Sequence, residues 1–298
     1  MARYYFRLEC LRMLRDPRYL ALAVIAPIGF YLLFATLFGG KTAPAGQQPQ
    51  LPQLPGTVEI MVAMAAYGAI WGALAATGPR IASERAGGWL EQVRAMPLTG
   101  RQVLAAKLAA GMVVALPALL LVCATGAAVK DVRLDAAQWA ALIGATWLGS
   151  LPFALMGVAI GYAVGAETAF PLSYALYMAM AALGGLWVPP SRLPSSFLHV
   201  ADALPTYRLA DLGWHITAGH APTFADVAVL GAWTVGLGAL AALAYRAPRR
   251  ARRRPGGAAG PGGPAGSAGS AVPTEAAGTS DAVGDAARSD PRTVGVHA

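Results

Sequence analysis

The stretch Ile81–Lys107 reads IASERAGGWLEQVRAMPLTGRQVLAAK, and its first part, Ile81–Arg101, is a charged and amphipathic island between two long apolar segments. Its adjacent glycines, Gly87 and Gly88, weaken any helix that leaves the preceding segment, because glycine costs about 1 kcal/mol in a helix interior relative to alanine. Pro97 stops the chain from continuing as a helix, and Thr99 is a suitable N-cap for the next one. The island is therefore predicted to hold a short helix that lies between two long apolar helices.

The two faces of this short helix differ in polarity. Trp89, Leu90 and Val93 can share an apolar face, while Glu91 and Arg94 point away from it. A soluble partner with a groove for the apolar face would transmit its own movement to the helices on both sides. The alternative is a connector that rests on a membrane surface without a partner.

The composition of the chain is that of a membrane protein. Of its 298 residues, 56% are hydrophobic and only 13% are charged, and the mean hydropathy is +0.50. Soluble domains carry about 25% charged residues. The net charge of +8 does not indicate nucleic acid, because the arginines lie beside apolar segments rather than in a folded basic domain. Cys10 and Cys123 lie in a basic and an apolar segment, so neither a disulfide nor a thiolate metal site is expected.

Six apolar segments have about the length of 20 residues that a helix needs to cross a bilayer. They are Leu20–Phe38, Val58–Thr77, Val103–Val129, Trp139–Val164, Ala169–Val188 and Val227–Tyr245. The predicted fold is an all-α membrane protein in which residues 20–247 form a six-helix transmembrane domain. Residues 1–19 are either a basic amphipathic helix in the membrane interface or an ordinary positive flank. Residues 248–298 are a basic and then Gly/Ala/Pro-rich tail that is expected to be disordered.

The segment Pro189–Phe224 is too apolar for a solvated loop and too interrupted by proline for one helix. Two short amphipathic helices that dip into the membrane interface, as a re-entrant segment, fit it better. The candidate metal ligands in this segment are His199, His215, His220, Asp202 and Asp211. Asp211 and His215 share a helix face, but without a recognised ligand spacing hydrogen bonding at the interface is the favoured role, and no metal site is predicted.

Basic residues are distributed unevenly over the two sides that six spans define. One side carries five arginines in residues 1–19, four between Arg80 and Arg101 and six in Arg246–Arg254, whereas the other side carries five basic residues in all. Cytoplasmic loops are rich in lysine and arginine. Both termini and the island are therefore predicted to be cytoplasmic, and Pro189–Phe224 external. The abundance of Ala, Gly, Arg and Pro is typical of a GC-rich bacterial genome, so a bacterial cell membrane is expected.

Five glycines have the spacing that permits close contact between membrane helices. They are Gly68 and Gly72 in the second span and Gly157, Gly161 and Gly165 in and after the fourth. Small residues four apart let helix backbones approach one another. The alternative is that glycine is simply common in membrane helices and in this composition.

Motifs for catalysis or ion-coupled transport are weak in the sequence. Residues Ala35–Thr42 match a relaxed phosphate-loop pattern, but an apolar segment precedes them where that motif needs a strand. Neither ATP nor another cofactor is predicted to bind this chain. The spans hold essentially no ionisable residue away from their ends, which argues against a proton- or sodium-coupled carrier. The energy source is expected to lie outside this polypeptide.

The island also carries a family pattern. Glu84-Arg85-x-x-Gly88-Trp89-Leu90-x-x-Val93-Arg94-x-x-Pro97-Leu98 resembles the cytoplasmic signature of ABC-2-type ABC transporter permeases. Lys107 follows in the third span, where its side chain can extend toward the membrane surface. The resemblance covers residues 1–247 and includes the sequence of Leu186–Leu209. It does not extend to the tail, residues 248–298.

The resemblance implies partners and a direction of transport. Two such subunits pair as a homodimer or heterodimer among membrane lipids, and a separate ATP-binding subunit docks on each island. The coupling residues implied are Glu84, Arg85, Gly88, Trp89, Leu90, Arg94 and Pro97. ATP and Mg²⁺ belong to that partner, so this chain is not expected to be an enzyme.

The expected activity is efflux. The resemblance implies a pathway along spans one, two and five, and their apolar composition favours a hydrophobic drug, secondary metabolite or lipid as cargo, with antibiotic resistance as one outcome. One alternative is a secondary transporter, and another is a membrane enzyme that uses the external His/Asp residues.

Overall fold

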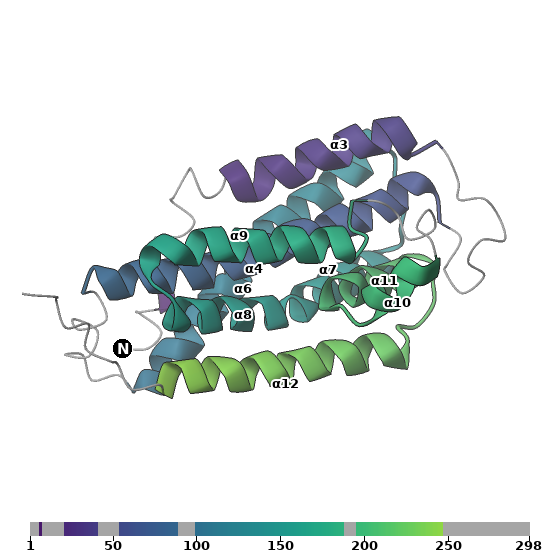
Figure 1. Ribbon diagram of the computed structural model, residues 1–298. Helices are drawn as coiled ribbons and strands as arrows, with labels where there is room; N and C mark the ends of the chain where they lie inside the picture. The colour runs from purple at the N-terminus through teal and green to yellow at the C-terminus, as the bar shows by residue number, and fades with distance from the viewer. Residues whose placement is uncertain (1–5, 8–20, 41–53, 89–98, 188–194, 247–298) are drawn as a thin grey trace, which may run out of the picture. The chain divides into compact units, whose positions relative to one another are not determined.

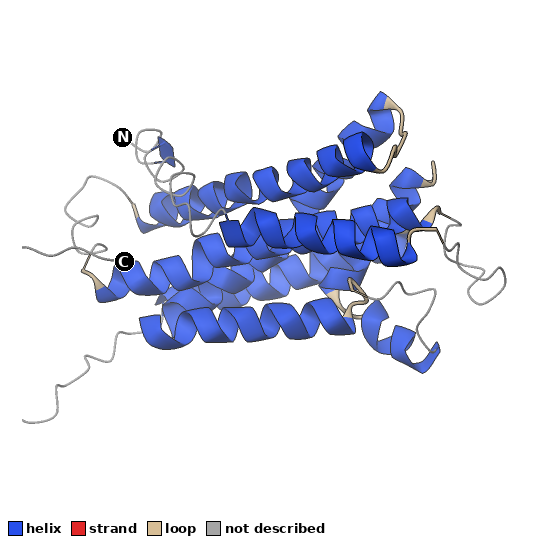
Figure 2. Cartoon of the chain, turned by 90° about the horizontal axis from the view of Figure 1, so that it is seen from above, coloured by secondary structure: helices blue, strands red, loops and turns tan. Residues whose placement is uncertain are grey.

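The structure, a computed structural model, describes residues 6–7, 21–40, 54–88, 99–187 and 195–246. Every regular element in these residues is helical and none is a strand (Figure 2). The helices are η1 (Ala21–Ile25), α3 (Ala26–Phe38), α4 (Gly56–Ala86), α6 (Gly100–Val129), α7 (Ala136–Gly149), α8 (Leu151–Ala163), α9 (Ala166–Leu183), α10 (Ser195–Asp202), α11 (Pro205–Thr217) and α12 (Phe224–Arg246). The all-α prediction is confirmed for the described part of the chain.

Helix α4 is the centre of the helix bundle. It packs against α3, α6, α8, α9 and α11 (Figure 1). No side chain between Met61 and Leu74 is more than 5% exposed. A helix that is apolar all round is a buried helix, and the many alanines and glycines of α4 let neighbours approach it on every side. The other helices are thus arranged around α4.

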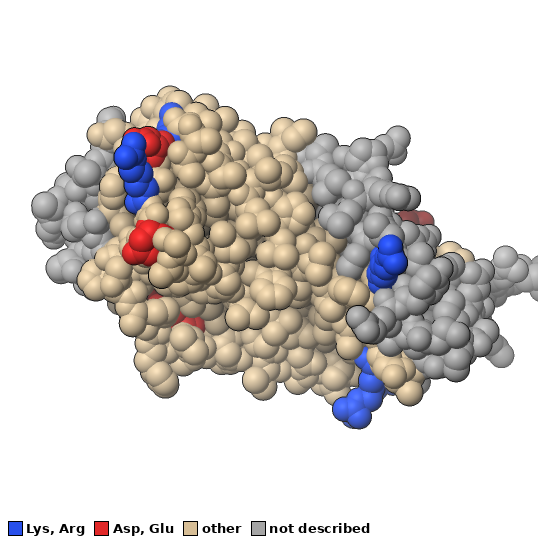
Figure 3. All heavy atoms as spheres, turned by 180° about the vertical axis from the view of Figure 1, so that it is seen from behind, with Lys and Arg blue, Asp and Glu red and all other residues tan. Residues whose placement is uncertain are grey.

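Four helical stretches are long and apolar enough to cross a membrane, namely Gly56–Ala86, Gly100–Val129, Ala136–Ala163 and Phe224–Arg246. The shorter Ala23–Phe38 is also apolar. On the face shown in Figure 3, charged side chains gather toward the two ends of the helices and leave an uncharged band between them. Such a band suits a hydrocarbon core about 30 Å thick. The 18-residue α9 is not among the four, so six spans remain a prediction.

The second span ends later than predicted. Helix α4 continues beyond Thr77 to Ala86, with Pro79 inside it, so the first six residues of the island, Ile81–Ala86, belong to this helix. The predicted boundary followed apolarity, whereas the helix persists as long as its backbone hydrogen bonds are uninterrupted. The island therefore begins inside a long rigid element.

The fourth and fifth spans also differ from the prediction. The fourth consists of two helices, α7 and α8, which meet at Ser150. Pro152 lies at the start of α8, where it cannot donate a backbone hydrogen bond to α7. Helix α9 ends at Leu183 rather than Val188, because Gly185 adopts a φ of 71° that glycine accepts without strain.

The segment between α9 and α12 contains two short helices, α10 and α11, as predicted. All residues of α11 except Arg208 and His215 are buried. The helix packs against α4, α7, α9 and α12, and Trp214 Nε1 donates a 3.0 Å hydrogen bond to the carbonyl oxygen of Glu59 on α4. Helix α11 is therefore an integral part of the bundle near the beginning of α4.

Two predicted regions lie mainly outside the described residues. Only Phe6 and Arg7 of the N-terminal segment 1–19 are described, and both are helical. The tail 248–298 is not described. Residues Ala35–Phe38, the start of the phosphate-loop pattern, belong to α3, so a helix occupies the place where that motif needs a strand.

Candidate functional site

One acidic side chain joins two basic ones near the end of α4 that leads into the island. Glu84 Oε1 lies 3.3 Å from Arg80 Nε, one turn earlier, and Glu84 Oε2 accepts a hydrogen bond from Lys107 Nζ on α6. Lys107 is only 1% exposed. A buried ammonium group requires a partner of opposite charge. The prediction that Lys107 extends to the membrane surface is wrong, because Glu84 holds it inside the protein.

Arg85, the next residue, joins α4 to α8. Its Nη1 donates hydrogen bonds to the carbonyl oxygens of Gly161 and Tyr162, at 2.7 and 2.8 Å, and its guanidinium carbon lies 5.8 Å from the centre of the Tyr162 ring. The last carbonyl groups of a helix have no partner within it, and they carry the negative end of its dipole. Arg85 therefore caps α8 from a neighbouring helix.

The chain leaves this cluster through a defined break. Gly88, with a φ of 74°, follows Gly87 and ends α4. Helix α6 then starts from a capping box, in which Thr99 Oγ1 accepts from Gln102 N and Gln102 Oε1 accepts from Thr99 N, as the position of Thr99 predicted. The structure thus defines where α4 ends and where α6 begins, on either side of the predicted short helix. The predicted coupling residues Trp89, Leu90, Arg94 and Pro97 lie outside the described residues.

The glycines expected at helix contacts have different surroundings. Gly68 and Gly72 on α4 face α3 and α6, Gly157 and Gly161 on α8 face α4, and Gly165 precedes α9 with no atom near the place of a Cβ. A Cβ added at Gly72 would lie 2.8 Å from Ala115 Cα, closer than real Cβ atoms approach a backbone. The α4–α6 contact at Gly72 therefore requires a residue without a side chain.

Aromatic rings cluster where α4 meets α9. Trp71 is 5.0 Å from Tyr177 between ring centres and lies edge-on to Phe170 and Tyr174. The rings of Phe170 and Tyr174 are parallel within 6° and are 48% and 43% exposed as residues. Phe30 on α3 extends the cluster through Tyr67. The exposed rings, Phe170 and Tyr174 on α9, therefore form an apolar, ring-rich surface, and the buried rings of Trp71 and Tyr177 pack behind them.

A second charged cluster lies at the opposite end of the bundle, around Arg208 of α11. Its guanidinium nitrogens lie 3.2 Å from Asp202 Oδ1, 3.3 Å from Asp226 Oδ1 and 3.7 Å from Asp211 Oδ2. His215 Nδ1 lies 3.4 Å from Asp211 Oδ1. Burial raises the pKa of Asp211 to about 7, and the negative charge of Asp226 adds to this, while His215 and Arg208 oppose it.

The structure brings together only part of the His/Asp set that the sequence suggested. His199 and His220 are exposed and lie outside this cluster. Asp226 on α12 belongs to it but was not identified from the sequence. Its signal was a capping pattern, Thr223-x-x-Asp226, in which Thr223 N and Oγ1 donate to Asp226 Oδ2 at 3.0 and 2.7 Å.

Similarity to known proteins identifies the family of this chain. A protein of Bacillus subtilis (strain 168) named "Putative transport permease YvfS" is 26% identical over 224 residues, which are 74% of this chain and 87% of that protein. Residues 3–212 match the family described as ABC-2 type transporter. Because this match spans more than two thirds of the chain, the protein belongs to the ABC-2 type transporter family, as a multi-pass membrane permease subunit that lacks an ATPase site of its own.

Proposed function

We propose that this permease exports an apolar, ring-bearing compound with energy from a separate ATP-binding subunit that docks on the island Ile81–Arg101. ABC-2 permeases work with ATP-binding subunits. In this proposal the partner binds ATP and Mg²⁺, and it contacts Glu84, Arg85, Gly88, Trp89, Leu90, Arg94 and Pro97. This chain supplies the pathway and no ATP chemistry.

The observation that carries the proposal is the attachment of α4 to its neighbours in the first residues of the island. Glu84 joins α4 to α6 through Lys107, and Arg85 joins α4 to α8. Since α4 is also the buried centre of the bundle, a force applied beyond Gly88 acts on three helices at once. This arrangement suits a permease that is switched from outside the membrane.

The ring-rich surface of α9, with buried rings of α4 behind it, supports an aromatic or otherwise hydrophobic cargo. Exposed rings such as Phe170 and Tyr174 bind apolar ligands by stacking and by burial of their surface. A sugar chain would need hydrogen-bonding groups in place of these rings. A drug, a secondary metabolite or a lipid fits better, and antibiotic resistance by efflux is the corresponding physiological role.

The proposal includes a membrane topology for this chain and its pairing with a second permease subunit. Helices α3 and α9 count as the first and fifth of six spans, and the excess of arginine places both termini and the island in the bacterial cytoplasm. Two permease subunits, identical or different, enclose the pathway within the lipid bilayer.

The alternatives have less support. Among the described residues, the buried Asp, Glu, Lys and Arg side chains are Lys107, Asp211 and Asp226. Lys107 and Asp226 lie near helix ends, and Asp211 lies on the short α11, so they do not form the midplane relay that an ion-coupled carrier uses. A membrane enzyme would rely on the cluster around Arg208.

The test is reconstitution with the partner. The permease is purified from native membranes, the co-purifying ATP-binding protein is identified, and both are placed in liposomes containing a hydrophobic fluorescent dye. We expect ATP-dependent dye transport that Trp89→Ala with Leu90→Ala reduces at least about tenfold, because hot-spot contacts contribute 1.4 kcal/mol or more. Leu240→Ala, which removes an exposed apolar side chain of α12, is the matched control.

Dye transport by the permease alone, without nucleotide, would reject the proposal in favour of a secondary transporter. Equal transport by the island double variant and by the wild type, at equal amounts of inserted protein, would remove the island from the mechanism.

A further inference from the structure

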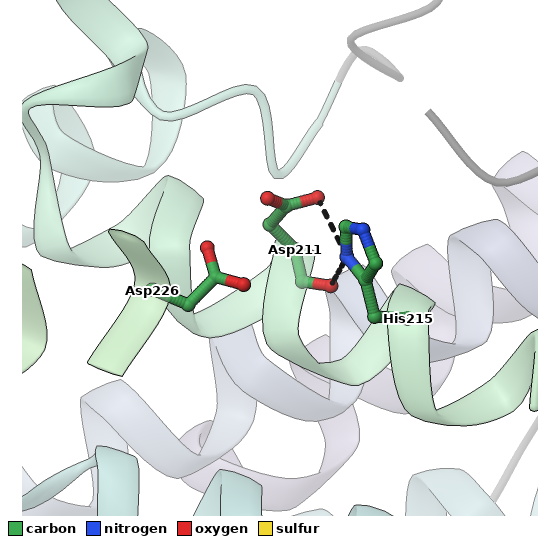
Figure 4. Close-up of side chains that lie close together, drawn as sticks. All are labelled: Asp211, His215 and Asp226. Carbon is green, nitrogen blue, oxygen red and sulfur yellow. Dashed lines mark hydrogen bonds and ion pairs between the residues drawn. The ribbon is translucent and has the colours of Figure 1, made fainter. Parts of the chain in front are cut away.

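Asp211, His215 and Asp226 converge at the end of the bundle away from the island. Asp211 and His215 lie one turn apart on α11, and Asp226 lies in the first turn of α12. One ligand atom from each lies within 4.8 Å of the other two. Figure 4 shows the two carboxyl groups and the imidazole ring turned toward one another. Two helices thus contribute three side chains of metal-binding type to one point.

The charges around this point do not balance. Arg208 is bound chiefly to Asp202, with Nε 2.8 Å from the Asp202 carbonyl oxygen and Nη2 3.2 Å from Oδ1. It reaches Asp226 and Asp211 only through Nη1. One guanidinium group therefore faces three carboxyl groups, and two of them, Asp211 and Asp226, are 4% and 0% exposed. Burial disfavours the negative charge of these carboxyl groups, and a bound cation would offset this cost.

One oxygen of this cluster lacks a hydrogen bond. Asp211 Oδ1 is buried without a hydrogen-bond partner among the described residues, and it lies 3.4 Å from His215 Nδ1. Nδ1 instead lies 2.9 Å from the carbonyl oxygen of Asp211. A buried acceptor without a partner costs about 1–3 kcal/mol. Asp226, by contrast, is fixed by Thr223 at Oδ2, which leaves Oδ1 facing the cluster.

We propose that Asp211, His215 and Asp226 bind a divalent transition-metal ion, with zinc as the best match, and that the ion joins α11 to α12. Imidazole nitrogen with two carboxylate oxygens is a ligand set for zinc, whereas calcium and magnesium prefer oxygen alone. The separation of Asp211 Oδ1 from His215 Nδ1, 3.4 Å, is close to the roughly 3.4 Å edge of a zinc tetrahedron with ligand distances of about 2.0–2.1 Å. A water molecule completes the fourth position.

The metal would replace the contact between Arg208 Nη1 and the two acids. Arg208 keeps its bonds to Asp202 in that case, so its own charge stays paired. The ion supplies the positive charge that the buried pair lacks and binds the orphaned oxygen of Asp211. The site holds the first turn of α12 against α11. This role does not depend on the cargo or on the partner subunit.

The test uses the full-length permease in detergent micelles after treatment with a chelator and buffer exchange. Zinc chloride is added in a calorimetric titration near pH 7, with magnesium and calcium chloride in separate titrations. We expect binding of one zinc ion per chain, a higher melting temperature, and no comparable effect of magnesium or calcium. His215→Gln and Asp211→Asn should each weaken zinc binding by at least the 10–100-fold that even outer-shell partners contribute. The matched control is His220→Gln, since His220 is exposed beyond α11.

Two further readouts keep the test decisive if a variant folds poorly. Cobalt(II) bound at the site should show the intense visible absorption of a four-coordinate ion, and His215→Gln should abolish it while His220→Gln retains it. Asp226→Asn also removes the cap of α12, so its melting temperature is compared without metal first. Zinc binding that is absent, or that His215→Gln and Asp211→Asn leave unchanged, would overturn the proposal.

Discussion

Arg85 on α4 donates a 2.7 Å hydrogen bond to the carbonyl oxygen of Gly161 on α8. A side chain of one helix thus binds the unpaired carbonyl groups at the end of another, which is the function a C-cap normally performs within its own helix. The two helix ends are fixed to each other within the first residues of the island, just before α4 ends at Ala86. The following predictions concern this end of the bundle, the packing of α4, the ring-rich surface and the cluster around Arg208.

Replacing Arg85 with leucine should destabilise the permease and weaken coupling. The variant leaves the carbonyl groups of Gly161 and Tyr162 without a donor, and hydrogen bonds from charged groups contribute about 1.5–3 kcal/mol. Thermal unfolding in micelles should show a lower melting temperature, and the partner's ATPase should turn over with less transport per ATP. Arg133→Leu, which changes an exposed arginine between α6 and α7, is the control and should change neither quantity.

The pair Glu84–Lys107 should behave as a coupled unit. Glu84→Gln removes the charged acceptor of Lys107 Nζ, and a hydrogen bond to a charged group contributes about 1.5–3 kcal/mol. Lys107→Met should cost less, because Glu84 keeps Arg80 as a partner. The double variant should be more stable than Glu84→Gln alone, as measured by unfolding of all three proteins. If the two single effects simply add, the ion pair does not contribute to the stability of the α4–α6 contact.

Gly72→Ala should disturb the centre of the bundle. The added methyl group would lie 2.8 Å from Ala115 Cα, so α6 must move away from α4, and overpacking of this kind costs about 1–3 kcal/mol. Gly144→Ala on α7 is the matched control, because nothing lies within 4 Å of its added methyl group. It should stabilise the helix slightly. Equal melting temperatures for the two variants would contradict the close contact at Gly72.

The ring-rich surface should determine which cargo is carried. Phe170→Ala with Tyr174→Ala removes two exposed, stacked rings without opening the buried core. Transport of an aromatic dye should fall about tenfold or more, since aromatic contacts contribute about 0.5–1.5 kcal/mol each beyond their area. Leu33→Ala, an exposed apolar residue of α3, tests for a general effect of lost hydrophobic surface. Similar losses in both proteins would argue against specific recognition by the rings.

The chelator-treated protein should lose stability as pH rises. The folded state raises the pKa of Asp211 from 3.8 to about 7, so it binds more protons than the unfolded state between these values. Stability is then greatest below about pH 4 for this group and declines up to about pH 7. The groups facing Asp211 are Asp202 on α10, Tyr207, Arg208 and His215 on α11, and Asp226 on α12.

Melting temperatures measured across this pH range should fall less steeply in Asp211→Asn. Asp131→Asn, which changes an exposed aspartate between α6 and α7, is the control and should keep the slope of the wild type. A slope that survives in Asp211→Asn would assign the effect to another group of the cluster.

The features that the sequence predicted well are those that depend on neighbouring residues. Apolar runs located the long helices, the glycine pair located the end of α4, and Thr99 located the start of α6. The prolines of Pro189–Phe224 indicated two short helices, which the structure contains. Helix caps and apolar length are local properties, so they can be inferred without knowing the fold.

Contacts between distant residues could not be inferred in this way. Lys107 meets Glu84 across 23 residues, and Arg85 meets Gly161 across 76. Nothing near Lys107 in the sequence shows that its charge is buried. Asp226 lies between the predicted segment Pro189–Phe224 and the predicted span Val227–Tyr245, and its contact with Arg208 joins residues 18 positions apart. These side chains acquire their environment only when the helices pack.

The division of the fourth crossing at Ser150 has a mechanical consequence. Helix α7 packs on α11, whereas α8 packs on α4 and α12. A continuous rod can only tilt as a whole, but a jointed one lets its halves swing separately. The break at Ser150 therefore lets each half of this segment take the direction that its own neighbours impose, α7 along α11 and α8 along α4 and α12.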